Sequence, residues 1–588
     1  MLLQNKISFG HMIKHCFPFT LPFPERVSIA IQRIVIVVAG LIVLLISTAS
    51  AQATPIPTPE TNIVKPKIIE EPEYKRETPK PEITEPPLHN GAKRLSDSTR
   101  VFVKKFAVTG VTVFSKEEIA QVTAPYEKKE MGFEEMEEVR RALTFLYVNK
   151  GYINSGAVIP DQKVEDGLIQ IHVVEGKLVH LDVTGVEKLR ADYVSVRIKL
   201  GVGEPVNIND IQNALVLLQQ NPLIKKINAE LKPGLVPGES ELKVNVAENA
   251  PDHLWVRYGN TQSPSVGAER GEVQYANSNF SGYGDTLDFR FGRTISLTDF
   301  ELKYDRPLTA NDTSIGFVIG RNNSTVIEAP FQRLDIASET ETYGLSVGRP
   351  FYKTADTSFS MDLALENRHS YTFILGRPFS FSESGDNGHT VDTVIRFKQN
   401  YSDRGRTQVV AARSVISWGL DAMGATIKDN VADGRFLAWL GQFQWARRLS
   451  DAGSQFIFGL NAQMARDPLL PMEKFAVGGM ATVRGYRENL LVRDNGLTAS
   501  MEFMIPLFQY GEGLVQAAPF AQYGRSWNTR GGTPDPDSIY SVGAGAIWDI
   551  TKNTRLQAYY GYPLVKIEHG QGSLQEKGFH FLLTSELY

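Results

Sequence analysis

The chain contains one cysteine, Cys16, which lies in an N-terminal segment with the features of a secretory signal. The mature chain would contain none, which excludes disulfide bonds and thiolate metal sites. The histidines of the mature chain are scattered, without the H-E-x-x-H motif or the i, i+4 spacing of a metal-binding helix. We therefore expect neither a metal ion nor any other cofactor.

Apolar runs long enough to cross a membrane as a helix are also absent. The run from Ile34 to Ile46 has about thirteen residues, whereas a spanning helix needs roughly 20. Basic residues precede this run, and Ala49 and Ala51 follow it in an A-x-A arrangement. Residues 1–51 are thus predicted to be a signal peptide. The alternative is a single membrane anchor.

The charge balance and the motifs exclude further classes of function. The formal net charge is −4, without the basic excess that is typical of nucleic-acid-binding proteins. The phosphate-binding pattern G-x-x-x-x-G-K-[ST] does not occur. We expect no nucleic-acid partner and no enzyme activity.

Residues 52–98 are rich in proline, glutamate, lysine and threonine and poor in aromatic residues. Such a segment cannot bury enough apolar surface to fold alone, and proline removes helix donors. We predict a disordered or extended linker here.

Two consecutive segments, 100–176 and 177–249, share one order of expected elements. Each opens with a strand that reaches a glycine, Gly110 or Gly185, continues with two helices and closes with two strands. The repetition predicts two small α+β domains.

From His253 to Tyr588 the apolar residues recur with period two. The segment DTLDFRFG is an example, because its apolar side chains alternate with charged ones: Leu287, Asp288, Phe289, Arg290, Phe291. A soluble β-sandwich would alternate in the same way, but the signal and the terminal aromatic residue favour a lipid-facing barrel with a wet lumen. About 336 residues allow about sixteen antiparallel strands. We expect segments such as 376–392 to be loops outside the cell.

The first repeat ends in the segment GYINSGAVIPDQKVEDGLIQIHVVEG, residues 151–176, which resembles POTRA (polypeptide-transport-associated) domains of two-partner secretion transporters. The second repeat is similar to POTRA domains in its order of elements. The resemblance implies a module whose exposed strand edge takes up an extended substrate by β-augmentation. The alternative is a spacer without a binding role.

The barrel region contains the segments GYGDTLDF (282–289) and LLPMEKFAVGGMATVRGYRENLLVRDNG (469–496). Together with the POTRA-like repeats, they resemble the haemolysin secretion/activation proteins, the outer-membrane half of two-partner secretion systems. The resemblance covers roughly residues 100–588. It implies α+β periplasmic POTRA repeats followed by an all-β transmembrane barrel.

The resemblance also singles out a loop motif. Its residues are Val483, Arg484, Gly485 and Tyr486. In that family the loop folds into the lumen, and its arginine binds an F-x-D-x-G motif on a nearby strand. The corresponding residues here are Phe520, Gln522 and Gly524, so glutamine replaces the aspartate.

This replacement leaves the arginine without the expected negative charge. A glutamine oxygen accepts a hydrogen bond but has no charge, and a buried guanidinium is costly unless compensated. The period-two pattern of LTASMEFMIPL turns Glu502 towards the lumen. We therefore hypothesise a latch in which Arg484 pairs with Glu502 and hydrogen-bonds Gln522. Asp494 is a second candidate acid, and a solvated loop arginine is the alternative.

The resemblance implies export of one large exoprotein, such as an adhesin or haemolysin-like protein, from the periplasm to the cell surface. This exoprotein would dock on the POTRA domains and pass unfolded through the barrel. The expected location is the bacterial outer membrane, with outer-membrane lipid and, during biogenesis, the barrel assembly machinery as further partners. The alternatives are an insertase for outer-membrane proteins and a passive pore.

Overall fold

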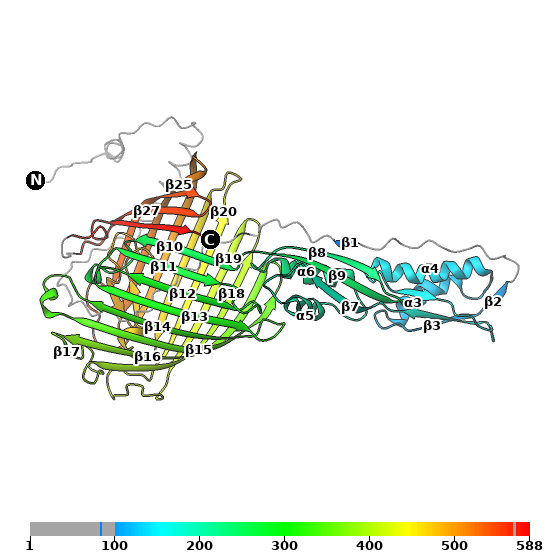
Figure 1. Ribbon diagram of the computed structural model, residues 1–588, viewed down its shortest axis with the longest axis horizontal. Coiled ribbons are helices and arrows are strands. Elements are labelled where there is room, and N and C mark those ends of the chain that lie inside the picture. The colour runs from blue at the N-terminus through cyan, green and yellow to red at the C-terminus, as the bar shows by residue number, and fades with distance from the viewer. Residues whose placement is uncertain (1–73, 75–82, 85–99, 568–571) are drawn as a thin grey trace, which may run out of the picture. The chain divides into compact units, whose positions relative to one another are not determined.

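The computed structural model describes residues 74, 83–84, 100–567 and 572–588 (Figure 1). The predicted signal peptide, residues 1–51, lies outside the described residues. The predicted linker, residues 52–98, also lies outside them except for Tyr74 and Ile83–Thr84. Within the described part of the chain, no helix is both long and apolar enough to cross a membrane.

The first folded region is a small α+β unit. Its elements are β2 (Val101–Val103), β3 (Lys105–Thr109), α3 (Lys116–Thr123), η1 (Ala124–Tyr126), β4 (Lys129–Met131), α4 (Phe133–Asn149), β5 (Gly156–Val158) and β6 (Leu168–Val174). Strand β6 lies in the centre of a three-stranded sheet, parallel to β3 and antiparallel to β5.

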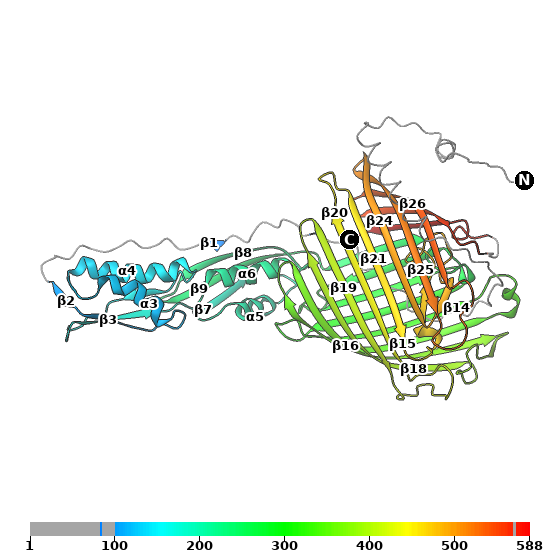
Figure 2. The same cartoon turned by 180° about the vertical axis from the view of Figure 1, so that it is seen from behind.

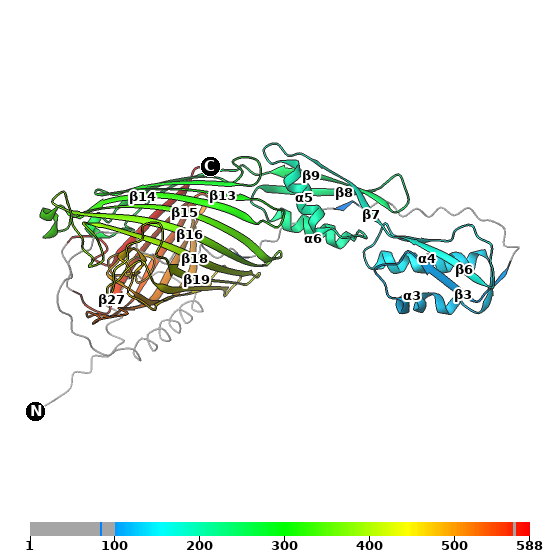
Figure 3. The ribbon, with the colours of Figure 1, turned by 90° about the horizontal axis from the view of Figure 1, so that it is seen from below.

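Helix α4 packs on this sheet because its apolar residues recur every four positions. Val139, Leu143 and Tyr147 therefore share one face and are fully buried. They pack with Ile169 and Ile171 of β6 in one core, and Figure 3 shows helix α4 beside this strand.

The second region repeats the order of the first. Its elements are β7 (Lys177–Thr184), α5 (Ala191–Gly201), α6 (Ile208–Gln219), β8 (Ile224–Pro233) and β9 (Glu239–Glu248). The sheet order is β1-β8-β9-β7, where β1 (Ile83–Thr84) lies parallel to β8 and Ile83 pairs with Ala229. A segment from the predicted linker thus adds a strand to this sheet edge.

A glutamate at the end of the last strand plays the same part in both regions. In the first, Glu175 accepts hydrogen bonds from the backbone N–H groups of Thr112 (2.7 Å) and Val113 (3.4 Å) and from the Tyr147 hydroxyl (2.7 Å). In the second, Glu248 accepts from the backbone N–H groups of residues 187–189. Each carboxylate therefore fixes the turn that leads from the first strand to the helices.

Sixteen antiparallel strands then form a closed barrel, which confirms the predicted architecture (Figures 1 and 2). They are β10 (Asp252–Gly259), β11 (Arg270–Asn277), β12 (Thr286–Arg293), β13 (Leu297–Pro307), β14 (Ser314–Thr325), β15 (Ala337–Lys353), β16 (Thr357–Ile374), β18 (His389–Arg404), β19 (Gln408–Gly419), β20 (Leu437–Arg448), β21 (Gln455–Ala465), β24 (Asn495–Tyr510), β25 (Gly513–Trp527), β26 (Ser538–Thr551), β27 (Thr554–Pro563) and β28 (Phe579–Glu586). The two-residue strand β17 (Arg377–Pro378) pairs with the end of β16. The barrel closes where β10 pairs with β28.

The outer face of the barrel is apolar. Leu345 of β15 and Leu363 of β16 are 60% and 54% exposed. Their neighbours on the other face include charged residues that are buried, such as Arg368 and Arg396. Alternation of this kind places lipid-facing side chains outside and polar ones in the lumen.

One sequence expectation about the loops is partly wrong. The connection expected at residues 376–392 ends at residue 388, because β18 begins at His389. Asp392 pairs in register with Arg368 of β16 and is fully buried. The turn-like composition ends at Gly388, and ladder pairing with β16 continues from His389 onwards.

The Glu175 contacts generate a stability prediction with a defined sign. Burial alone would raise the pKa of Glu175. The hydrogen bonds from Thr112, Tyr147 and Val113 lower this pKa by more than burial raises it, so the net shift is downward. The stabilisation that these hydrogen bonds provide is therefore present above the pKa of glutamate in the unfolded chain, about 4.3. It is lost as the pH falls through the pKa of Glu175 in the folded protein, the folded value. We expect Glu175→Gln to cost about 1–2 kcal/mol above pH 6 and much less once the pH has fallen below the folded value.

Hydrogen exchange of the full-length protein, followed on peptides that cover α4 and β6, measures this loss of stability. The matched control is Glu138→Gln, which removes the same charge from an exposed position of α4. Equal exchange in the two variants at pH 6 would contradict the role of Glu175.

Candidate functional site

The loop that contains Arg484 connects β21 to β24 and spans residues 466–494. It has internal structure: the 3-10 turn η4 (Pro471–Glu473) and a hairpin of β22 (Phe475–Val477) with β23 (Leu491–Arg493). Phe475, Val477, Val483 and Leu491 are buried in one apolar cluster. The loop is therefore a folded element, which we call the lumen loop.

The ladder between β24 and β25 shows that this loop lies inside the barrel. Met501 is 44% exposed on the outer face, so its neighbour Glu502 faces the lumen. Ala521 pairs with Met501, which places Gln522 on the lumen face as well. Arg484 contacts both Glu502 and Gln522 and thus meets the wall from within.

Arg484 is 5% exposed and has polar partners on two adjacent strands. Its Nη2 donates to Glu502 Oε2 at 2.5 Å. Its Nε and its backbone N–H donate to Gln522 Oε1 at 3.2 and 2.7 Å. The neutral amide thus orients the arginine, whereas the carboxylate compensates its charge.

Two aromatic rings enclose the same guanidinium. Its central carbon lies 3.8 Å from the ring centroid of Phe520 and 4.2 Å from that of Tyr559. The Tyr559 hydroxyl donates to Glu502 Oε1 at 3.2 Å. Cation–π contacts of desolvated groups add to the ion pair, so three kinds of interaction converge on this arginine.

Two positions, Gly485 and Gly524, require glycine because the loop backbone and the barrel wall approach each other closely there. Gly485 has φ +95°, and a Cβ there would lie 2.7 Å from the carbonyl oxygen of Gly561 on β27. A Cβ on Gly524 would lie 2.3 Å from Val477 and 2.8 Å from Val483. These glycines let the lumen loop lie directly against the wall.

The remaining motif residues fix the loop on its other side. Val483 is fully buried in the apolar cluster of the loop. The Tyr486 hydroxyl donates to the carbonyl oxygen of Tyr540 at 2.9 Å and accepts from the backbone N–H of Val565 at 3.0 Å. Gly485 N donates to Nε2 of His580 at 3.0 Å, so this imidazole nitrogen carries no proton.

The second candidate acid, Asp494, does not contact Arg484. Its carboxylate accepts from the backbone N–H groups of Leu469 (3.1 Å) and Thr529 (2.9 Å). Asp494 therefore ties the ends of the lumen loop together. Because it directly precedes β24, the backbone places its side chain at the base of the loop, away from the motif.

Two residues at this site, and a third near the start of the lumen loop, were not predicted from the sequence. Tyr559 and His580 come from β27 and β28, and the sequence does not show how these strands lie against the loop. Glu473 lies in the predicted family segment, but nothing in its spacing indicated a partner.

A motif elsewhere in the barrel was also overlooked: residues 344–348, GLSVG, match the G-x-S-x-G pattern of hydrolases. They lie within strand β15 and not at the strand-to-helix turn that exposes a nucleophilic serine.

Comparisons with known proteins agree with this architecture. A family model described as "Haemolysin secretion/activation protein ShlB/FhaC/HecB" matches residues 238–547. A second, described as "POTRA domain, ShlB-type", matches residues 101–176.

Individual relatives are distant but extensive. The outer membrane transporter CdiB of Dickeya dadantii (strain 3937) is 21% identical over 396 residues, 66% of this chain and 69% of that protein. The heme/hemopexin transporter protein HuxB of Haemophilus influenzae is 20% identical over 463 residues, 75% of this chain and 80% of that protein.

A solved structure shares the fold. CdiB from Escherichia coli superposes with a TM-score of 0.62 at 18% identity, over 85% of this chain and 93% of that one. The family match extends over more than half of the residues. The chain therefore belongs to the haemolysin secretion/activation (ShlB/FhaC/HecB) family and is an outer-membrane transporter of the two-partner secretion type, with its POTRA region in the periplasm.

Proposed function

We propose that this transporter exports one large partner protein, of the adhesin or haemolysin-like class, from the periplasm to the cell surface. The partner docks as an extended chain on the POTRA region and passes unfolded through the barrel. The observation that carries the proposal is the lumen loop, which occupies the bore through non-covalent contacts alone. A bore filled in this way is opened by moving the loop.

The docking step is supported by the sheet edges of the POTRA region. Strand β8 already takes up a short parallel strand, Ile83–Thr84, from another part of the chain. In the first unit, β5 is an edge strand beside α4, where Ala157 N donates to Thr144 Oγ1 at 3.1 Å. Val158 of β5 and Phe145 of α4 are 46% and 55% exposed. An edge strand flanked by exposed apolar side chains is suited to β-augmentation.

The gating step rests on Arg484 and its partners. The buried guanidinium, Glu502 and Gln522 form a latch that holds the lumen loop in the bore. Breaking one side of a buried ion pair costs about 3–5 kcal/mol, which is enough to keep the bore closed without a substrate. Because the contacts are non-covalent, the latch is reversible. The folding of the exported chain outside the cell then makes its movement unidirectional.

Secretion by the native organism tests the export proposal. Deletion of the gene should remove one large protein from the medium or the cell surface, and the wild-type gene should restore it. A photo-crosslinking amino acid at Val158 should then trap this same protein, since it docks beside β5.

The matched control places the crosslinker at Glu117, an exposed position of α3. An unchanged set of exported proteins after deletion would contradict the export proposal. Equal adduct yield from Val158 and Glu117 would contradict docking at β5 alone.

The latch proposal predicts the outcome of Arg484→Gln. The substitution leaves Glu502 without its cation, so we expect the lumen loop to become sensitive to protease in intact outer membranes. The displaced state of the loop should become at least about tenfold more populated, because 1.4 kcal/mol already changes an equilibrium tenfold, and secretion should depart from the wild-type level. Arg377→Gln, in the exposed connection after β16, is the control and should behave as wild type. Wild-type secretion together with unchanged protease protection in Arg484→Gln would rule out the latch.

A further inference from the structure

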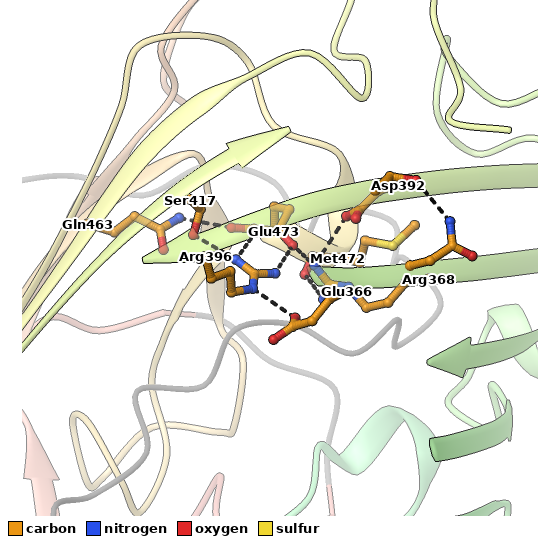
Figure 4. Close-up of polar contacts among 10 residues, drawn as sticks. Glu366, Arg368, Asp392, Arg396, Ser417, Gln463, Met472 and Glu473 are labelled. Atoms are coloured by element: carbon orange, nitrogen blue, oxygen red, sulfur yellow. Dashed lines mark hydrogen bonds and ion pairs between the residues drawn. The ribbon is translucent and has the colours of Figure 1, made fainter. Parts of the chain in front are cut away.

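A second group of buried charges joins the lumen loop to the wall, at Glu473 in the turn η4 (Figure 4). Glu473 is 3% exposed. Arg396 of β18 grips its carboxylate with both terminal nitrogens, Nη2 to Oε1 at 2.6 Å and Nη1 to Oε2 at 3.1 Å. A bidentate arginine–carboxylate pair is stronger and more specific than a single contact.

Arg396 is itself held by two further strands. Its Nε donates to Glu366 of β16 at 2.8 Å, and its Nη1 donates to Ser417 of β19 at 2.7 Å. The guanidinium is therefore positioned by the wall, and Glu473 fills the remaining side of it (Figure 4).

A second arginine, Arg368 of β16, reaches the same turn. It forms an ion pair with Glu473, and its Nη1 donates to the carbonyl oxygen of Met472 at 3.1 Å. Its Nη2 donates to the buried Asp392 at 3.1 Å. Gln463 of β21 donates to the carbonyl oxygen of Glu473 at 2.9 Å, so the turn is held through both side chain and backbone.

The charges of this group balance only when the loop is present. The wall contributes three cations and two carboxylates: Arg368, Arg396, Lys398, Glu366 and Asp392. The wall alone thus has a net charge of +1, and the Glu473 carboxylate brings the sum to zero. Buried charges that lose a partner are costly, so the wall favours the docked loop.

The two attachments have opposite polarity and lie on different parts of the barrel. At Glu473 the loop presents an anion to cations of β16 and β18. At Arg484 it presents a cation to an anion of β24. The strands β19, β20 and β21 lie between the strands that contribute the charged partners, β16 and β18 at one attachment and β24 at the other. Release at one attachment therefore leaves the loop held at the other.

We propose that Glu473 is a second anchor of the lumen loop, independent of the latch at Arg484, and that Arg368 and Arg396 form a carboxylate-binding site on the lumen wall. Glu473 fills this site while the bore is closed and vacates it when the loop moves. The vacated site takes carboxylates, for which aspartate and glutamate side chains of the exported chain are the source. This last step rests on the proposed export function, whereas the anchor does not.

Cysteine labelling of the full-length protein in the outer membrane tests the anchor. The only native cysteine is Cys16, in the predicted signal, so a cysteine introduced by Met472→Cys reports on the turn alone. Met472 is 1% exposed. In this background Glu473→Gln and Arg396→Gln should each raise the labelling rate by a soluble maleimide at least about tenfold.

A second reporter measures independence. Met480 packs against the cluster that contains Phe520, beside the latch. A cysteine introduced by Met480→Cys should label at the wild-type rate in Glu473→Gln, within about twofold. Both reporters rising together would contradict two independent anchors.

Ion selectivity in planar bilayers distinguishes whether Glu473 and Arg396 act through their charges or only through packing. Glu473→Gln removes an anion and should shift the reversal potential in a KCl gradient towards anion selectivity. Arg396→Gln removes a cation and should shift it the opposite way. A structural defect alone would shift the reversal potentials of both variants in the same direction. That result would overturn the proposal of a carboxylate-binding site.

The matched control is Glu383→Gln, which removes the same charge from an exposed position in the connection before β18. Glu473→Asp, which keeps the charge, should label more slowly than Glu473→Gln and remains informative if the amide variant does not assemble. Unchanged labelling at Met472→Cys in every variant would overturn the anchor. These measurements need no substrate, so they stand or fall separately from secretion.

Discussion

Compensation of buried charge inside the bore is the constraint on which this structure depends. Where the lumen loop packs against the wall, Arg484 and Glu473 are buried, and an unpaired guanidinium or carboxylate is strongly disfavoured there. Among its buried charges, the lumen loop presents Arg484 and Glu473 to wall residues of opposite sign. Because the polarities differ, the loop satisfies both charges in one orientation only. Its position therefore follows from electrostatics as much as from packing.

Close packing then makes those ion pairs possible. Gly485 and Gly524 remove the side chains that would keep the loop away from β27 and β25. The rings of Phe520 and Tyr559 complete the enclosure of the guanidinium. The same residues that recognise the arginine also exclude water from it, which strengthens its pairing with Glu502. The proposed gate needs a closure that is firm at rest and reversible, and a group of non-covalent contacts provides both.

Much of the fold could be predicted from sequence because its signals are local. The period-two alternation predicted the barrel, and it also turned Glu502 towards the lumen, where the structure has it beside Arg484. The repeated order of elements predicted two α+β units. Contacts between the loop and distant strands could not be predicted: Tyr559 and His580 approach the site only through the spatial arrangement of β27 and β28 around the loop. Asp494 failed as a candidate because a residue at the base of the loop binds backbone N–H groups there. Arg368 and Arg396 gave no signal, since lumen-facing arginines are ordinary in a barrel strand.

The most direct test of the account relocates the compensating charge. In Glu502→Gln the guanidinium loses its anion, whereas Gln522→Asp places a carboxylate on the neighbouring strand at the position that already contacts Arg484. Protease protection of the lumen loop should fall and secretion of the partner protein should depart from the wild-type level in Glu502→Gln, and both should recover in the double variant Glu502→Gln/Gln522→Asp. Failure of the aspartate to restore either quantity, in a barrel that is assembled at the wild-type level, would contradict the claim that charge compensation at Arg484 holds the loop in the bore.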